Sequence, residues 1–227
     1  GNIVTTAKAP QGTNAIAFGG MFKNVKRRPT GEYQFVTAGQ QTLCHWILEP
    51  QSGRLNCIKV PSRVQRNYTS VAWSDDFELV VLGSKSGDFA FCAFLDKRSL
   101  TLCDCVDATS GGVNAICSDG NFLDGTVRVI VGGGDGTIVV FTRDSQGFIE
   151  TAKAKVEGSV TSLCLSADRA EVVAGTASGN AYRLTTASLN TLLLCETHAA
   201  AVTDVAYAPK VSERFCTASE DGTLRIW

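Results

Sequence analysis

An internal repeat constrains the fold of this 227-residue chain more than any other feature. In each copy a short apolar run enters a patch of small residues, turns at a glycine and leaves as an alternating strand. The turn glycines Gly87, Gly136, Gly179 and Gly222 lie 49, 43 and 43 residues apart. Glycine adopts positive φ without steric cost, so it suits the tight turn of a β-hairpin. A period of about 40–45 residues is typical of a four-stranded propeller blade.

Each predicted hairpin is preceded by a short apolar strand. We expect inner strands at residues 13–18, 68–73, 113–117, 160–165 and 202–207. Fourth strands are clearest at residues 99–106, 148–156 and 190–196, and a shortened first hairpin covers residues 35–46. No sustained helical period separates these strands. The pattern predicts an all-β propeller with about five four-stranded blades, in repeat units 10–60, 61–107, 108–157, 158–197 and 198–227.

Two arrangements of the end units remain open. A predicted leading strand at residues 3–9 could complete the last unit and close a five-bladed ring. Alternatively, the units belong to a larger propeller, seven-bladed or tandem, in which other sheets cover the ends. We favour the second arrangement, because the last unit stops at Trp227 before a fourth strand of its own.

Composition narrows the classes of function. The chain has 21 Lys and Arg against 22 Asp and Glu, so its charge gives no reason to expect nucleic acid or an anionic membrane as partner. No run approaches the roughly 20 apolar residues that cross a bilayer, and no signal-peptide pattern begins the sequence. The nine cysteines lie mostly in apolar strands, so we expect reduced, buried thiols. The close pair Cys103 and Cys105 lacks the further ligands that zinc requires.

The last unit resembles a WD repeat. In that family a His before the inner strand, a Ser or Thr in the second strand, an Asp in the hairpin turn and a Trp in the third strand form a hydrogen-bonded structural set. The resemblance assigns these roles to His198, Thr217 or Ser219, Asp221 and Trp227. The same residue types could indicate a Ser-His-Asp triad, but in this family the hydroxyl is packed inside the blade. We therefore interpret the set as structural.

The other units depart from this pattern. The turn Asp recurs only as Asp135, and Ser86 and Ser178 replace it elsewhere. The Trp position holds Phe141 or Leu184. We expect these units to depend on apolar packing rather than on a polar network.

Over its whole length the chain also resembles the WD-repeat proteins associated with cilia and flagella. The stretches that carry this resemblance are residues 13–18, 82–88, 111–116, 158–163 and 201–207. Members of that family line the lumen of axonemal doublet microtubules. The resemblance implies a non-catalytic scaffold in the cytoskeleton of the ciliary or flagellar axoneme, with tubulin and neighbouring axonemal proteins as partners. The alternative is a soluble adaptor that presents peptides to an enzyme complex such as a ubiquitin ligase.

No motif for catalysis or for a cofactor is apparent. The two histidines are far apart in sequence, and His45 lies inside a predicted strand. The glycine run at residues 132–136 precedes a strand rather than a helix, so it is a hairpin turn and not a phosphate cradle. We therefore expect no enzyme activity, no cofactor, no metal site and no small-molecule substrate.

Two basic clusters are candidate partner contacts. The first lies in an insertion at residues 19–31, which we predict as a loop. Its basic residues are Lys23, Lys26, Arg27 and Arg28. The second cluster precedes the second inner strand and consists of Lys59, Arg63 and Arg66. Loops on a rigid scaffold often carry function, and Arg is enriched at interfaces; the alternative for both clusters is a solvated connection.

Overall fold

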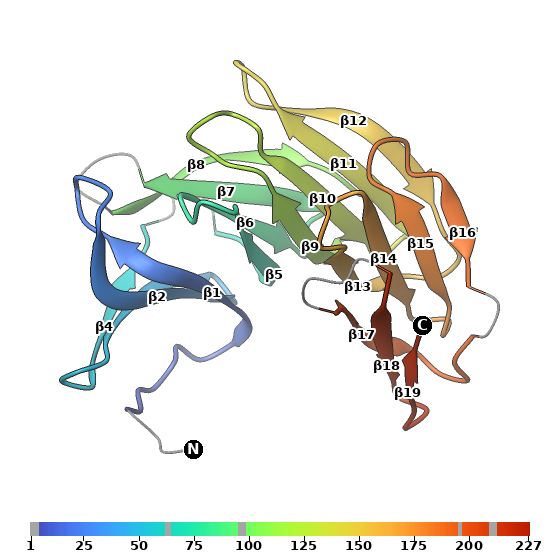
Figure 1. The fold of residues 1–227 in the computed structure, drawn as a ribbon, viewed down its shortest axis with the longest axis horizontal. Coiled ribbons are helices and arrows are strands. Elements are labelled where there is room, and N and C mark those ends of the chain that lie inside the picture. The colour runs from blue at the N-terminus through green and yellow to red at the C-terminus, as the bar shows by residue number, and fades with distance from the viewer. Residues whose placement is uncertain (1–4, 62–64, 95–98, 195–196, 209–212) are drawn as a thin grey trace.

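The computed structural model describes residues 5–61, 65–94, 99–194, 197–208 and 213–227. Its strands form five antiparallel sheets in chain order, four with four strands and the last with three. The sheets stand side by side along an arc, from the blue N-terminal sheet to the red C-terminal sheet (Figure 1). Among the described residues, no helix is long and apolar enough to span a lipid bilayer.

Each sheet is built from consecutive strands. The first contains β1 (Thr13–Lys23), β2 (Pro29–Gly39), β3 (Thr42–Glu49) and β4 (Arg54–Lys59). The second contains β5 (Tyr68–Trp73), β6 (Leu79–Ser84), β7 (Asp88–Phe94) and β8 (Leu100–Asp107), and the third contains β9 (Val113–Asp119), β10 (Arg128–Gly133), β11 (Thr137–Arg143) and β12 (Phe148–Lys155). The fourth contains β13 (Val160–Leu165), β14 (Glu171–Thr176), β15 (Ala181–Thr185) and β16 (Thr191–Leu193). The last contains β17 (Val202–Tyr207), β18 (Phe215–Ser219) and β19 (Leu224–Ile226).

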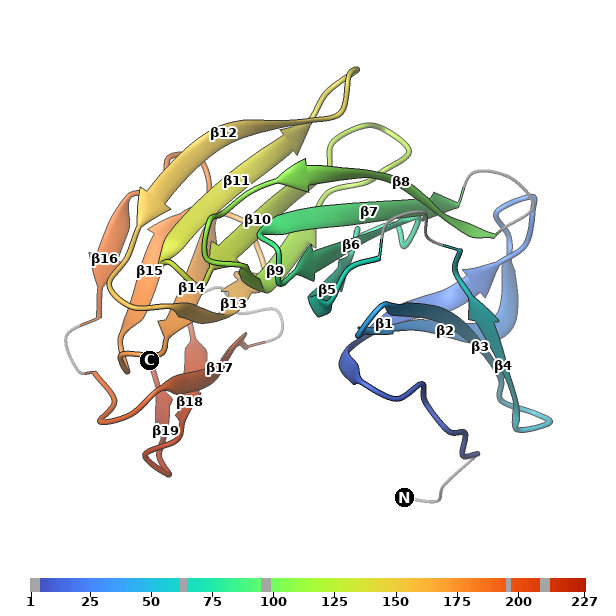
Figure 2. The same cartoon turned by 180° about the vertical axis from the view of Figure 1, so that it is seen from behind.

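The first strand of each sheet lies on the inside of the arc. There β1 contacts β5, β5 contacts β9, β9 contacts β13 and β13 contacts β17. All five inner strands begin at the residues expected from the sequence. The prediction of an all-β propeller is confirmed, and the view from behind shows the same succession of sheets (Figure 2).

The core lies between neighbouring sheets. In β6, Val80 and Leu82 pack towards the first sheet, whereas Leu79 and Val81 pack towards the third. Residues of one strand alternate between its two faces, so both faces of this sheet are covered and the strand is apolar throughout. A single sheet would leave one or both faces exposed, and the stack is therefore the unit that buries apolar area.

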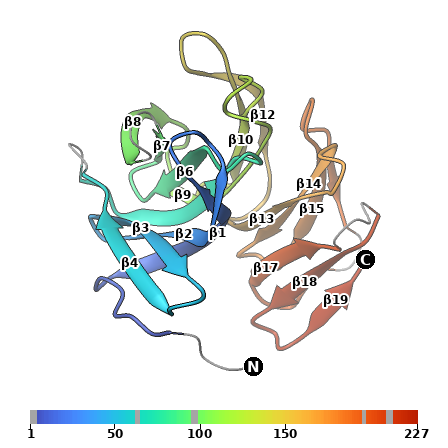
Figure 3. The same cartoon turned by 60° about the vertical axis from the view of Figure 1, so that its left-hand side comes forward.

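The expected leading strand is not observed. Residues 5–9 are outside any strand, and residues 1–4 lie outside the described residues. The last sheet accordingly keeps three strands. The first and last sheets stand on either side of the opening of the arc (Figure 3).

The insertion at residues 19–31 was wrongly expected to be a loop. Its two ends extend β1 and β2, and only a short turn separates the strands. The side chain of Asn24 closes this turn, because its Oδ1 accepts the backbone N–H groups of Lys26 and Arg28 at 2.9 and 3.1 Å. The extension also packs on the second sheet, where the Trp73 ring lies so close to Gly19 that a Cβ there would be 2.7 Å from ring atoms.

Candidate protein-binding surfaces

The last sheet brings four of the predicted polar residues together. His198 Nε2 lies 2.7 Å from Thr217 Oγ1, and His198 Nδ1 lies 3.1 Å from Asp221 Oδ2. The indole N–H of Trp227 donates to the same Thr217 oxygen at 3.1 Å. Ser219 is outside this set, because its hydroxyl donates to the carbonyl of Ala200 at 3.0 Å.

The environment of these four residues favours a structural role. Thr217 is 0 % exposed and His198 is 4 % exposed, so the hydroxyl that would have to act as a nucleophile is enclosed. Hydrogen bonds from Thr223, from the Ala199 amide and from His198 hold the pKa of Asp221 far below its usual value. We propose that the hydrogen bonds among these four residues hold the segment before β17 against the turn between β18 and β19.

Two other sheets contain side-chain hydrogen bonds that were not predicted from the sequence. In the first sheet, the Trp46 indole N–H donates to Thr37 Oγ1 at 2.8 Å, as Trp227 does in the last sheet. In the second sheet, Arg66 Nε donates to Asp88 Oδ2 at 2.8 Å. The expectation that these units depend on apolar packing rather than on a polar network is therefore wrong for the first and second sheets. The spacing of Thr37 and Trp46 along the first hairpin was the available signal.

Asp88 is the common acceptor of the side-chain hydrogen bonds in the second sheet. It also accepts hydrogen bonds from the hydroxyls of Ser84 and Ser86. Burial raises the pKa of Asp88, but the hydrogen bonds from these serines and from Arg66 outweigh it and leave the pKa below its usual value. Arg66 lies before β5 as His198 lies before β17. In the second sheet the ion pair of Arg66 with Asp88 therefore occupies the place that the hydrogen-bonded His198 imidazole has in the last sheet.

The hairpin turns contain the predicted glycines. Gly87, Gly136, Gly179 and Gly222 have φ values of 97°, 81°, 84° and 79°. Next to one of them, Asp135 accepts the Thr137 amide at 2.9 Å and the Ser110 hydroxyl at 2.7 Å. Burial opposes ionisation of this carboxyl, but hydrogen bonds from Thr137 and Ser110 dominate and lower the pKa of Asp135 to about 2.

The first basic cluster lies at the tip of the β1–β2 hairpin, and one of its members is engaged within the fold. Lys23 Nζ donates to the carbonyl of Asp76 at 2.7 Å and lies 3.5 Å from a Glu78 carboxylate oxygen. Lys26, Arg27 and Arg28 are exposed. Three cations, rather than four, therefore face solvent at this tip.

The second basic cluster borders a hollow between the first and second sheets. Arg63 lies outside the described residues, and Arg66 is paired with Asp88, whereas Lys59 is exposed. The hollow is lined by Gln41, Leu43, Lys59, Val60, Pro61, Gln65, Arg66 and Tyr68. An adjoining hollow adds Asn67, Lys85 and Ser86. The result is a surface of amides and cations above a small apolar floor, in which Gln41, Gln65 and Lys85 were not predicted.

Two backbone hydrogen bonds fix this surface, one between the first and second sheets and one within the second sheet. The Gln41 amide donates to the Arg66 carbonyl at 3.0 Å, and the Lys85 amide donates to the Asn67 carbonyl at 2.9 Å. Both bonds join a hairpin turn to the segment that enters β5. The hollow between sheets is therefore held by main-chain contacts rather than by side chains alone.

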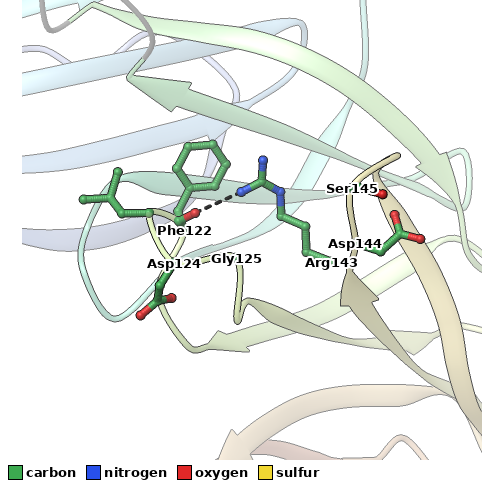
Figure 4. A pocket seen from close by; sticks show the side chains of 7 residues that line it. Phe122, Asp124, Gly125, Arg143, Asp144 and Ser145 are labelled. Atoms are coloured by element: carbon green, nitrogen blue, oxygen red, sulfur yellow. Dashed lines mark hydrogen bonds between the residues drawn. The ribbon is translucent and has the colours of Figure 1, made fainter.

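A further hollow lies at the rim of the third sheet (Figure 4). It is lined by Phe122, Leu123, Asp124, Gly125, Arg143, Asp144 and Ser145. Arg143 is already engaged there, because it donates to the Phe122 carbonyl at 2.9 Å and its guanidinium lies 4.1 Å from the centre of the Phe122 ring. Within the described part of the chain, no three His, Cys, Asp or Glu side chains gather as metal ligands would.

The stacked sheets define a β-propeller, and its last unit resembles a WD repeat in its His-Thr-Asp-Trp set. Residues 188–227 match the family described as WD domain, G-beta repeat. The fold is similar to the WD40 β-propeller domain of Doa1, with a TM-score of 0.69 and 14 % identity over 97 % of this chain and 66 % of that chain. It is also similar to the computationally designed Ika4 protein, with a TM-score of 0.58 and 22 % identity over 74 % of this chain and 95 % of that chain. At these identities the similarity concerns the fold alone.

Similarity to particular proteins confirms the resemblance drawn from the repeats. The chain is 27 % identical over 199 residues to Cilia- and flagella-associated protein 52 of Bos taurus, covering 85 % of this chain and 30 % of that protein. The Homo sapiens protein of the same name is 27 % identical over 198 residues with the same coverage. The chain thus spans about 30 % of the length of these relatives.

Proposed function

We propose that this chain is a non-catalytic, protein-binding scaffold of the ciliary or flagellar axoneme. The observation that carries the proposal is the similarity over 85 % of the chain to proteins named for their association with cilia and flagella. A WD-repeat propeller suits such a role, because a rigid stack of sheets presents its loops as binding surfaces. The enclosed Thr217 hydroxyl supports the absence of catalysis at the His198 set.

We further propose that the partner is acidic, such as tubulin or a neighbouring axonemal protein. The exposed cations Lys26, Arg27 and Arg28 form one contact, and the hollow that carries Lys59 and Lys85 forms the other. Exposed cations attract an acidic surface over about 8 Å at physiological ionic strength. Binding to an assembled polymer would favour the assembled state by mass action.

The location of the protein tests the axonemal role. The tagged protein is expressed in a ciliated cell, and isolated axonemes are extracted with detergent and then with high salt. Retention with the doublets through the detergent step supports the scaffold. Release with the soluble fraction, or absence from cilia, contradicts it and leaves the soluble adaptor as the alternative.

Charge variants test the two contacts separately. One variant carries Lys26→Ala, Arg27→Ala and Arg28→Ala and keeps Lys23, which is engaged with Glu78. A second carries Lys59→Ala and Lys85→Ala. A matched control carries Arg54→Ala and Lys153→Ala, which are exposed on outer strands. We expect the first two variants to leave the axoneme at lower salt than the control does; equal release of all three would contradict the charge-based contact.

A further inference from the structure

A threonine follows the three exposed cations at the tip of the β1–β2 hairpin. Residues 26–30 read Lys-Arg-Arg-Pro-Thr, and Arg27 and Arg28 are the only consecutive arginines in the sequence. They stand three and two residues before the hydroxyl of Thr30. Protein kinases select their acceptor residues partly by the pattern of charges around them. A kinase with an acidic substrate groove therefore finds a complementary segment here.

The backbone presents Thr30 to solvent. Lys23 pairs with Pro29 and Met21 pairs with Tyr33, so three residues of β2 oppose one residue of β1. Such a bulge leaves the extra residues outside the ladder. Pro29 adds to this break, because proline has no backbone N–H to donate to the ladder. Thr30 is the first residue of the bulge, and its side chain is exposed.

Few contacts hold the Thr30 side chain. Its hydroxyl donates to the carbonyl of Phe22 at 3.0 Å and accepts the amide of Glu32 at 3.3 Å, and both bonds lie at the surface. A Cβ added to Gly31 would meet nothing within 4 Å, so the space beside the bulge is open. The hydroxyl is therefore accessible once the single bond to the Phe22 carbonyl opens.

The base of the hairpin is fixed on the second sheet. Lys23 Nζ donates to the Asp76 carbonyl at 2.7 Å, and a Cβ on Gly20 would lie 2.8 Å from the ring of Phe77. These contacts come from the second sheet, so the position of the tip does not depend on what lies before the first strand. Exposed tips of this kind open locally at low cost, which is what a modifying enzyme requires.

We propose that Thr30 is the acceptor of a basophilic serine/threonine protein kinase, and that phosphorylation releases the tip from its acidic partner. The second half rests on the proposed function, which assigns Lys26, Arg27 and Arg28 to that partner. In the transfer, Thr30 Oγ1 attacks the γ-phosphorus of magnesium-bound ATP. The new Oγ1–P bond forms while the bond from that phosphorus to the β–γ bridging oxygen breaks, ADP leaves with this oxygen, and the hydroxyl proton passes to a carboxylate of the kinase.

The phosphate cancels the charge of the tip. Three cations and Glu32 give residues 26–32 a net charge of about +2. Phosphothreonine adds about −1.5 to −2 charges near neutral pH, which brings the segment close to zero. Its oxygens also accept charge-assisted hydrogen bonds from guanidinium groups. Arg27 and Arg28 would then bind the phosphate of their own hairpin instead of an acidic surface.

A kinase reaction tests the modification. The folded 227-residue chain is incubated with magnesium-bound ATP and the catalytic subunit of cyclic-AMP-dependent protein kinase, and the products are mapped by mass spectrometry. We expect phosphate at Thr30, no label there in Thr30→Val, and labelling at least tenfold slower in Arg27→Gln/Arg28→Gln. Circular dichroism verifies that each variant is folded. Absence of label at Thr30 in the folded chain would overturn the proposal.

Ser145 serves as a matched control within the same chain. It is exposed and Arg143 stands two residues before it. That guanidinium, however, lies 4.1 Å from the centre of the Phe122 ring and donates to the Phe122 carbonyl. We expect Ser145 to remain unlabelled while Thr30 reacts; equal labelling of both would overturn recognition of the tip by its cations.

Binding to an acidic probe tests the release. The probe is fluorescein-labelled poly-L-glutamate, and the chain carries Lys59→Ala and Lys85→Ala so that only the tip contact is measured. We expect phosphorylation to raise the Kd about fivefold, the loss of one or two exposed ion pairs. Thr30→Val treated with the same kinase keeps the Kd of the unphosphorylated chain. An unchanged Kd after labelling would overturn the release. Failure of the unphosphorylated chain to bind the probe would instead overturn the acidic contact of the proposed function, and labelling at Thr30 would still support the kinase site.

Discussion

Several glycines lie where two neighbouring sheets meet, and substitution of one of them tests how closely the sheets pack. In Gly175→Ala the added Cβ would lie 2.4 Å from Val202 Cγ1, 2.9 Å from Val202 Cβ and 2.7 Å from Ser162 Oγ. Val202 is β-branched and 0 % exposed, so its methyl groups have no room to turn away. Overpacking of this kind costs about 1–3 kcal/mol, and the stiffness of Val202 places the cost at about 2–3 kcal/mol. For a chain of this size the Tm falls by roughly 4–12 °C.

A double-mutant cycle isolates the contact. Val202→Ala alone removes two buried methyl groups, which costs about 1.6 kcal/mol before any cavity penalty. In the double variant the shortest contact, with Val202 Cγ1, disappears, whereas the contacts with the Cβ of residue 202 and with Ser162 Oγ remain, so the summed destabilisation falls short of additivity by about 1–2 kcal/mol. Urea unfolding followed by circular dichroism measures each free energy. Additive losses, or a Gly175→Ala variant within about 0.5 kcal/mol of its parent, would refute the steric reasoning.

Three further predictions concern single side chains. Thr217→Val removes the oxygen that His198 and Trp227 share. We expect it to lower the free energy of unfolding in urea by about 1–3 kcal/mol. The control Ser219→Ala lies outside this hydrogen-bonded set and should lower it by less than about 1 kcal/mol. The fold lowers the pKa of Asp135 to about 2, so its ionised form stabilises the protein above about pH 4. This stabilisation is lost as the pH falls towards 2. Asp135→Asn should therefore flatten the dependence of Tm on pH between about pH 4 and pH 2. Cys57 is exposed, whereas Cys44 is buried and burial raises its pKa to about 11. Iodoacetamide at neutral pH followed by mass spectrometry should therefore label Cys57 and spare Cys44 unless the protein is unfolded.

Local chemistry made much of the fold predictable. Turn glycines at a regular spacing identify hairpins, because positive φ is a property of single residues and needs no distant partner. Apolar runs of five or six residues then mark the inner strands, and all five begin where the pattern indicates. The His198 set could be proposed from the resemblance of one unit alone.

The partners of the charged residues could not be predicted in this way. Lys23 and Arg66 were predicted as candidate partner contacts, yet each is held within the fold by a carboxylate, Glu78 and Asp88, that follows it by 55 and 22 residues. The extended β1–β2 hairpin has the same origin, because Trp73 of the second sheet packs on Gly19. These contacts form only when two sheets stack, and no local pattern encodes them.

The sequence alone determines that the chain is a series of similar four-stranded units, since strand period and turn chemistry are local. Only the tertiary structure decides which faces of those units are covered. Val160-Thr161 and Val202-Thr203 are identical dipeptides at identical places in their sheets. Both threonines bond within their own sheet, but among the described residues only Thr161 also bonds across to a next sheet. The difference lies in the neighbour rather than in the dipeptide, because a sheet face is buried by the sheet that stands against it.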